Sequence, residues 1–272
     1  MKYALFTGAA GGLGGASALA LIEKGWTVFA ADYDEVALSK KANIQGFVPI
    51  KVDITDMASI ENAKKEVLKW TDKLDAVINF AGIHSMGSLI EGDIVKTVER
   101  MVDINVLGMV RINRVFFDMV KKGNGRIINC SSECGWMKAQ PFNGPYAMTK
   151  YAVEGYTDSL RRELLFQGIK CIKIQPGSFK TQMHGQATAA FDKMIANTQY
   201  YKGTLTKMKP MMTVELKMAN DPKYLVQAVV EACEAENPKT LYRVKNSKLL
   251  GSLEFMPNKL IDVIYTALLK NQ

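Results

Sequence analysis

Short apolar runs alternate with longer amphipathic stretches along nearly all of the 272-residue chain. The apolar runs predict strands at residues 3–6, 27–31, 47–52, 76–80, 126–130, 170–175 and 240–243. Between them, helical periodicity predicts helices near residues 12–24, 35–41, 57–71, 93–122, 145–167, 222–236 and 258–270. Because strands separated by crossover helices are typical of a doubly wound parallel sheet, we expect a three-layer α/β Rossmann fold.

No change of composition and no polar linker divides the sequence, and its length suits one large hydrophobic core. We therefore expect a single domain over residues 1–272. Within it, residues 183–219 are predicted to form a helical lid, and residues 249–272 an apolar C-terminal segment.

The formal net charge of +8 comes from the part of the chain after residue 100, where basic side chains are scattered. Nucleic-acid binding needs cations clustered on one element with aromatic side chains among them, so this pattern indicates a solvated basic surface. The first strand begins too early for a signal peptide, and no apolar run is long enough for a membrane span. We expect a cytoplasmic protein with at most weak membrane contact.

Four cysteines and two histidines lack the spacing of a metal site, and Cys130 and Cys134 form only a C-x3-C. Reduced core thiols are the expected state of these cysteines. The sequence therefore predicts no metal centre.

A glycine-rich turn joins the first predicted strand to the helix that follows. Its sequence is Thr7-Gly8-Ala9-Ala10-Gly11-Gly12-Leu13-Gly14. Glycines let the backbone approach a pyrophosphate closely, and the free amides and dipole of a new helix favour its negative charge. A plain strand-to-helix turn is the alternative interpretation.

Asp32 ends the second predicted strand, 18 residues after Gly14, near the position where an acid accepts hydrogen bonds from an adenosine ribose. A helix N-cap or turn role is the alternative. No Arg or Lys occurs between Thr7 and Ala16 or directly after Asp32, so a ribose 2′-phosphate would meet an anion without a counter-charge. The sequence therefore favours NAD over NADP.

Tyr146 and Lys150 stand four residues apart, which places both side chains on one helical face. A free phenol has a pKa of about 10, and a neighbouring ammonium can bring it toward the range of a general base. Tyrosine and lysine also meet at this spacing on many solvated helix faces. The pair gains its weight from the glycine turn and Asp32.

Together these features resemble the short-chain dehydrogenase/reductase family over essentially the whole chain. Phe80 departs from the family pattern, because it replaces the second asparagine of the family's N-N-A-G segment. The resemblance implies cofactor contacts at Gly8, Gly12, Leu13, Gly14, Asp32, Asp53, Ile54, Asn79, Ala81, Gly82, Tyr146, Lys150, Pro176, Gly177 and Thr181.

The resemblance also implies a catalytic set of Asn105, Ser132, Tyr146 and Lys150, in which Asn105 holds a water of the proton relay. Its alternative role is that of a helix-distorting structural amide. Ser131 competes with Ser132, because successive side chains at a strand end point in opposite directions and only one can face the cofactor. Glu133 is interpreted as a solvated loop acid or a determinant of substrate polarity.

The apolar C-terminal run and the methionine-rich lid resemble the steroid, retinoid and hydroxy-lipid branch of the family. The implied activity is NAD-dependent interconversion of a secondary alcohol and a ketone on a hydrophobic substrate, in a homodimer or homotetramer. A nucleotide-sugar epimerase or dehydratase is one alternative, and the spacing of the glycine turn argues against it. A non-catalytic dinucleotide-binding regulator is the other, and it would not need the serine, tyrosine, lysine and asparagine together.

Overall fold

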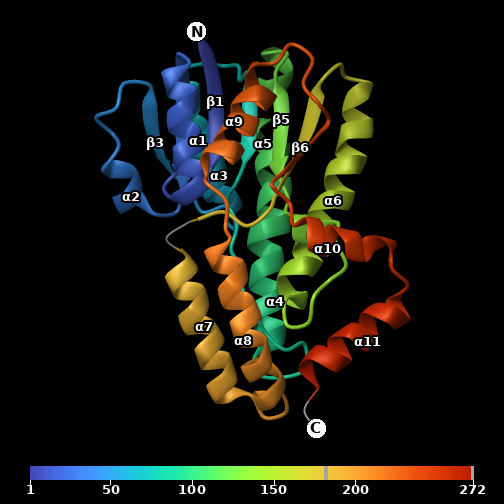
Figure 1. Ribbon diagram of the computed structural model, residues 1–272. Coiled ribbons are helices and arrows are strands. Elements are labelled where there is room, and N and C mark those ends of the chain that lie inside the picture. The colour runs from blue at the N-terminus through green and yellow to red at the C-terminus, as the bar shows by residue number, and fades with distance from the viewer. Residues whose placement is uncertain (181–182, 271–272) are drawn as a thin grey trace.

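A computed structural model describes residues 1–180 and 183–270 of the chain. Its centre is one parallel sheet with the strand order β3-β2-β1-β4-β5-β6-β7 (Figure 1). This order, with the crossover helices between strands, confirms the predicted doubly wound α/β fold. The strands are β1 (Lys2–Thr7), β2 (Trp26–Asp32), β3 (Phe47–Lys51), β4 (Ala76–Asn79), β5 (Arg126–Cys130), β6 (Lys170–Pro176) and β7 (Leu241–Val244).

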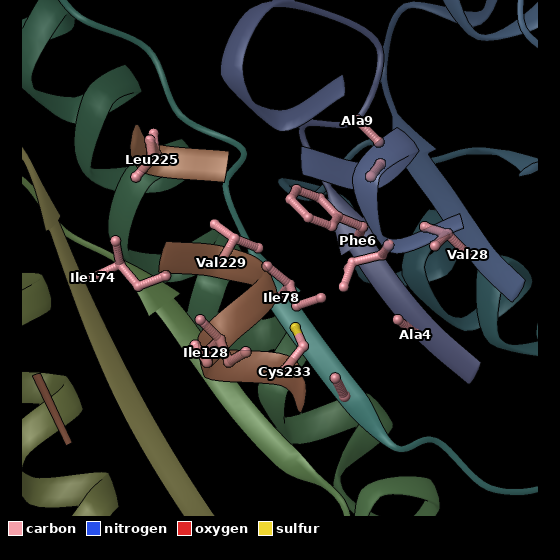
Figure 2. Packing of buried hydrophobic residues seen from close by; sticks show 14 of the residues in the cluster. Ala4, Phe6, Ala9, Val28, Ile78, Ile128, Ile174, Leu225, Val229 and Cys233 are labelled. Atoms are coloured by element: carbon pink, nitrogen blue, oxygen red, sulfur yellow. The ribbon is translucent and has the colours of Figure 1, made fainter. Parts of the chain in front are cut away.

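Helices cover both faces of the sheet, and each face has its own hydrophobic core. One core lies under α1 (Gly12–Glu23), α2 (Glu35–Ser39) and α9 (Lys223–Glu234), where Phe6 packs with Ile78 and Val229 (Figure 2). The other lies under α3 (Met57–Leu68), α5 (Met109–Lys122) and α6 (Gly144–Leu165). Leu5 points into this second core, because neighbouring residues of a strand face opposite sides of the sheet.

The helix predicted over residues 93–122 is interrupted in the structure. It consists of α4 (Ile94–Val102), a π-helical turn η1 (Asp103–Gly108) and α5. Asn105 lies inside this turn and is buried. The predicted alternative role of Asn105, a helix-distorting amide, therefore agrees with the local geometry.

Two helices beyond the carboxyl ends of the strands form a cap, α7 (Met183–Asn197) and α8 (Lys202–Lys217) (Figure 1). They share a small apolar cluster of Phe191, Leu205 and Met212, which Phe142 of the body joins. The chain ends in α10 (Lys248–Ser252), the short η3 (Leu253–Phe255) and α11 (Asn258–Leu269), of which α11 packs against α8. Among the described residues, no helix combines the length and apolarity needed to cross a bilayer.

Candidate active site

The glycine turn between β1 and α1 has the shape of a phosphate cradle. A β-carbon at Gly14 would lie 2.1 Å from the carbonyl oxygen of Gly8, so these backbones touch only because a side chain is absent. At Gly11 and Gly12, by contrast, a β-carbon would meet nothing within 4 Å. Helix α1 starts at this open side with no side-chain cap and no acidic residue in its first turn. Its first amides are thus free to bind a pyrophosphate.

Asp32 at the end of β2 is tied to the same turn. Its carboxylate accepts hydrogen bonds from the amide of Ala10 at 2.9 Å and from the amide of Asp34 at 3.1 Å. The N-cap of α2 is Asp34, which accepts from the amide of Ala37, so the alternative of an Asp32 N-cap is wrong. The predicted role of Asp32 at the adenosine ribose fits its place beside the turn.

Asp53 and Ile54 follow β3 with their side chains already engaged. The Asp53 carboxylate accepts from the backbone amide of Thr55 at 2.9 Å and from its hydroxyl at 2.7 Å. Ile54 packs on the π-helical turn, where a β-carbon at Gly108 would lie 2.6 Å from the Ile54 Cδ1. A contact of these two residues with an adenine stays a prediction.

The side chain of Asn79 points into the interior, between β4 and its neighbours. Its amide donates to the side-chain oxygens of Asn113 at 2.7 Å and Asn129 at 2.9 Å. Ala81 lies close to the glycine turn, because a β-carbon at Gly8 would stand 2.7 Å from the Ala81 amide nitrogen. We infer that any cofactor contact from this segment would come from the backbone of Ala81 and Gly82 rather than from the Asn79 amide.

Pro176 and Gly177 leave β6 at the same edge of the sheet. The Gly177 amide donates to the carbonyl oxygen of Val244 at 2.9 Å, and a β-carbon at Gly177 would lie 2.1 Å from the carbonyl oxygen of Lys245. Glycine is therefore needed here for the close approach of two backbones. Thr181, the third predicted residue of this segment, lies outside the described residues.

Tyr146 and Lys150 project from the first turns of α6, which begins at Gly144 with Pro145 in its first turn. The Lys150 Nζ lies 5.6 Å from the centre of the Tyr146 ring and donates to the carbonyl oxygen of Cys130 at 3.1 Å. Burial lowers the pKa of Lys150, while Cys130, Cys134 and Glu154 act in the opposite direction. The two side chains predicted to act together are thus held side by side.

Burial dominates the electrostatics of Tyr146 and raises its pKa above the ordinary value. A hydrogen-bond interaction with the Ser132 hydroxyl acts against this rise, since it stabilises the phenolate. Any lowering of the tyrosine pKa by Lys150 is outweighed by burial in this arrangement. The Tyr146 hydroxyl is therefore held as the protonated phenol.

The two serines after β5 point in different directions. Ser132 faces the Tyr146 hydroxyl and also accepts from the Cys134 amide at 3.2 Å. Ser131 points toward Gly135, where a β-carbon would lie 2.7 Å from its Oγ, and within the described residues this buried Oγ has no hydrogen-bond partner. Of the two candidates, only Ser132 shares the space in front of Tyr146.

Asn105 connects the π-helical turn to its surroundings with both ends of its amide. Its Oδ1 accepts from the Ile83 amide at 2.7 Å, and its Nδ2 donates to the Ile83 carbonyl at 2.8 Å and to the Thr149 hydroxyl at 3.1 Å. Thr149 precedes Lys150 on α6. Asn105 therefore holds together three segments of the site, and its part in a water relay stays a prediction.

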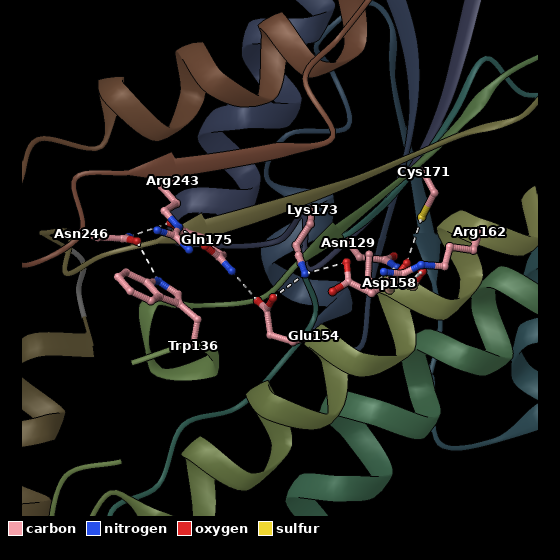
Figure 3. Close-up of polar contacts among 11 residues, drawn as sticks. Asn129, Trp136, Glu154, Asp158, Arg162, Cys171, Lys173, Gln175, Arg243 and Asn246 are labelled. Atoms are coloured by element: carbon pink, nitrogen blue, oxygen red, sulfur yellow. Dashed lines mark hydrogen bonds and ion pairs between the residues drawn. The ribbon is translucent and has the colours of Figure 1, made fainter. Parts of the chain in front are cut away.

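A buried ion pair fastens α6 to the sheet one turn after Lys150 (Figure 3). The Lys173 ammonium on β6 lies 2.5 Å from the Glu154 carboxylate and 2.9 Å from that of Asp158. The Lys173 and Glu154 side chains are only 8% and 13% exposed. Glu154 also accepts from Gln175 at 2.9 Å, so the helix that carries the tyrosine is anchored to β6 by polar contacts.

Comparison with known proteins identifies the family. A sequence model described as short chain dehydrogenase matches residues 2–191. The chain belongs to the short-chain dehydrogenase family.

Two relatives of this short-chain dehydrogenase align with nearly all of its length. It is 28% identical to an NADPH-dependent 3-dehydrocapnine reductase of Ornithobacterium rhinotracheale, over 97% of this chain and 96% of that protein. It is likewise 28% identical to retinol dehydrogenase 16 of Mus musculus, over 97% and 87%. A short-chain dehydrogenase/reductase of Burkholderia phymatum, solved in complex with NAD, has the same fold, with a TM-score of 0.76, 20% identity and coverage of 97% and 95%.

Two residues beside the short-chain dehydrogenase site were not identified as partners of the tyrosine from the sequence. His84 stands edge-on to the Tyr146 ring, with ring centres 4.6 Å apart, and lies 3.3 Å from the Asn143 side-chain oxygen. Its pKa is lowered, mainly by burial. Asn143 precedes α6 and is itself buried. The only sequence signal for His84 is its place just after the Asn79 segment.

Glu133 is buried in this short-chain dehydrogenase, so its interpretation as a solvated loop acid is wrong. It is 7% exposed, because the C-terminal segment folds over it and the Ser247 amide donates to its carboxylate at 2.7 Å. The pKa of Glu133 is raised to about 7, chiefly by burial; the hydrogen bond from the Ser247 amide acts against this rise and the charge of Glu215 adds to it. Glu133, Glu215, Asn143 and Leu250 line a cavity of about 40 Å³ next to the tyrosine helix.

Proposed function

We propose that this protein interconverts a secondary alcohol and a ketone on a hydrophobic, steroid-like or lipid-like substrate with NAD(H). The observation that carries the proposal is the meeting of Ser132, Tyr146 and Lys150 at the edge of the sheet where the glycine cradle opens. In open parallel sheets ligands bind at the carboxyl ends of the strands, and all of these groups follow such ends. Membership of an oxidoreductase family supports the reaction type.

The roles of the residues follow from their positions. A bound nicotinamide dinucleotide would supply or accept the hydride. The glycine cradle at Gly12, together with Asp32 and Lys150, would hold it. Ser132 binds the substrate oxygen by donating a hydrogen bond, and Tyr146 gives its proton to that oxygen in the direction of ketone reduction. Because burial keeps the Tyr146 phenol protonated, the geometry supports a proton donor in that direction. In oxidation the step runs backwards: the Tyr146 phenolate takes the proton from the alcohol hydroxyl as the hydride leaves the carbinol carbon.

The substrate class is inferred from what surrounds the tyrosine. The cap adds methionines 194, 208 and 212 to an apolar cluster, and thioether side chains adapt to irregular apolar ligands. The cavity of about 40 Å³ is much smaller than the roughly 300–1,000 Å³ of a typical ligand site, so a steroid-like or lipid-like substrate would need space beyond this cavity. The name of the retinol dehydrogenase relative is consistent with such a substrate.

The preference for NAD rests on Asp32, whose carboxylate stands where an adenosine ribose would lie and would repel a 2′-phosphate. The relative named as an NADPH-dependent reductase shows that the choice of cofactor differs among similar proteins. Direct measurement with both cofactors is therefore part of the test.

We also propose that the protein is a homodimer or homotetramer in the cytoplasm. The long helix α6 presents the exposed apolar side chains of Met148 and Leu165, which a second copy would cover. Sedimentation equilibrium of the purified protein measures the mass directly, and a monomer at all concentrations would contradict the assembly.

The function is tested by following NADH absorbance over a panel of hydrophobic ketones, with sugar nucleotides as a second panel. We expect net oxidation of NADH with at least one hydrophobic ketone. Tyr146→Phe is expected to abolish this turnover while leaving NADH binding nearly unchanged, because only the hydroxyl is removed. Sugar conversion without net oxidation would identify an epimerase or dehydratase, and NADH binding without any conversion would identify a regulator; either result contradicts the proposal.

A further inference from the structure

Lys41 brings a positive charge to the glycine turn, whose own sequence from Thr7 to Ala16 contains no Arg or Lys. The residue follows α2, where the chain returns toward the sheet, and its Nζ donates to the carbonyl oxygen of Ala10 at 2.6 Å. The glycine at position 15 leaves room for it, since a β-carbon there would lie 2.8 Å from the Lys41 Nζ. A lysine that lies beyond α2 in the sequence thus reaches the cradle.

The ammonium of Lys41 and the carboxylate of Asp32 are attached to the same residue of the turn. Asp32 accepts from the Ala10 amide, and Lys41 donates to the Ala10 carbonyl. Opposite charges therefore stand on the two sides of a single residue. If Asp32 binds the adenosine ribose, a 2′-phosphate on that ribose would lie beside the same turn residue, Ala10, to which the Lys41 ammonium is bound.

Among residues 1–180 and 183–270, no ion pair includes the Lys41 ammonium. Its bonded partner is a neutral carbonyl, and an ammonium has three donors, so it has capacity to bind an anion. The acidic groups near α2 are otherwise engaged: Glu35 pairs with Lys51, and Asp34 caps the helix. The charge of Lys41 is thus free to bind a ligand.

We propose that Lys41 is a specificity-determining residue that lets the adenosine end of the cofactor site accept a ribose 2′-phosphate, so that NADP(H) binds as well as NAD(H). This inference rests on the proposed function and changes the strict preference for NAD that Asp32 alone implies. The contact with the Ala10 carbonyl holds the Lys41 ammonium at the turn where this phosphate would bind. A charge-assisted hydrogen bond to phosphate offsets the repulsion from the Asp32 carboxylate.

The test measures binding of adenosine fragments to the intact protein by isothermal titration calorimetry. The probes are 2′,5′-ADP, which carries the 2′-phosphate, and 5′-AMP, which does not. Wild type is expected to bind both. In Lys41→Met the affinity for 2′,5′-ADP is expected to fall about tenfold or more, and that for 5′-AMP by less than about twofold, as expected for the loss of one charged contact.

Three variants sharpen the result. Lys40→Met removes an exposed neighbouring lysine and should change neither affinity. Lys41→Arg keeps the positive charge and should restore most of the 2′,5′-ADP affinity. Gly15→Ala keeps the lysine in the sequence but adds a methyl group that displaces its ammonium from Ala10, so it should weaken binding of 2′,5′-ADP more than that of 5′-AMP.

Equal losses for 2′,5′-ADP and 5′-AMP in Lys41→Met would show that the lysine only braces the turn, and would overturn the proposal. Failure of the wild type to bind 2′,5′-ADP while it binds 5′-AMP would overturn it as well. Both readouts are independent of turnover, so a protein that reduces no ketone would contradict the proposed function and leave this result intact.

Discussion

The carboxylate of Glu133 accepts a hydrogen bond of 2.7 Å from the backbone amide of Ser247, the N-cap residue of α10. This contact joins the residue next to Ser132 to a part of the chain more than a hundred residues away. It also buries an acid whose pKa is raised to about 7. Stability near neutral pH should therefore depend on this one group.

The wild type is expected to lose unfolding free energy as the pH rises, and Glu133→Gln is expected to lose less. A carboxyl group with a raised folded-state pKa contributes stability that is fully present below its unfolded value near 4.5 and is lost as the pH rises to about 7. The loss is about 3 kcal/mol at most, from the size of the shift. Urea unfolding at pH 5 and pH 8 measures it, and the difference between the two should shrink in Glu133→Gln.

Glu61→Gln on the exposed side of α3 is the matched control for this measurement. It should leave the difference between pH 5 and pH 8 as it is in the wild type. An equal change in both variants would show that Glu133 is not responsible.

His84 should affect stability in the opposite pH direction. Its pKa is lowered below the ordinary value of 6.5, first by burial, so stability is lost as the pH falls below about 6.5 and the unfolded chain takes up a proton that the folded chain does not. His84→Phe keeps an aromatic edge against Tyr146 and should lessen this acid sensitivity in thermal unfolding. Turnover of this variant at pH 8 should stay within about tenfold of wild type, because a neutral imidazole is too weak an acid to serve as the proton donor. A loss of activity as complete as that of Tyr146→Phe would instead place His84 in the proton transfer.

The two serines after β5 should separate cleanly in mutagenesis. Ser132→Ala is expected to lower kcat by about a hundredfold to a thousandfold, as loss of one donor to a developing oxyanion does. Ser131→Ala should leave kcat nearly unchanged and keep or slightly raise the melting temperature, because the hydroxyl it removes is buried without a hydrogen-bond partner in the described part of the chain. Steady-state kinetics with NADH and calorimetry decide the matter, and the reverse ranking would favour Ser131.

Removing one partner of the buried ion pair between Lys173 and Glu154 should destabilise the fold more than replacing both partners. Lys173→Met leaves the Glu154 carboxylate uncompensated in the interior and should cost about 3–5 kcal/mol of unfolding free energy. The double variant Lys173→Met/Glu154→Gln should cost less, because the neutral amide can still accept from Gln175. Urea unfolding measures both, and a double variant as unstable as the single one would argue against a charge effect.

An exposed pair on α3 provides the comparison. Lys69 and Glu66 form an ion pair with side chains 65% and 54% exposed, and Lys69→Met should cost less than about 1 kcal/mol. A similar cost at both pairs would mean that burial does not control the energy of the Lys173 contact.

The strands could be predicted from the sequence because their apolar runs are continuous and bounded by turns. β5 lies at residues 126–130 as expected, and the other strands differ from the prediction by at most one residue at either end. The long helix 93–122 was predicted as continuous, since hydrophobic periodicity over a long window does not resolve a single turn with a different hydrogen-bond pattern. The helix α10 was not predicted separately within the apolar C-terminal run, because five residues are too few to show helical periodicity.

The candidate site divides along similar lines. Tyr146, Lys150 and the glycine turn are fixed by local spacing, and their geometry could be anticipated from the sequence. The burial of Glu133 and the reach of Lys41 depend on segments that meet only after folding, the C-terminal segment in one case and the return from α2 in the other. No local pattern encodes either contact. The choice between Ser131 and Ser132 could be made only from the structure, because it depends on which side chain points toward Tyr146.

The π-helical turn η1 sets the rotation of one half of the long helix against the other. A π turn accommodates one residue more than an α turn, so the side chains of α4 and α5 no longer follow a common helical stripe. Asn105 lies at this offset, and its amide faces Ile83 while α5 faces the sheet. A deletion of one residue between positions 103 and 108 would restore a regular helix and remove the wide turn that holds the Asn105 amide against Ile83. The position of Asn105 at Ile83 thus depends on the π-helical turn, which a continuous α-helix would lack.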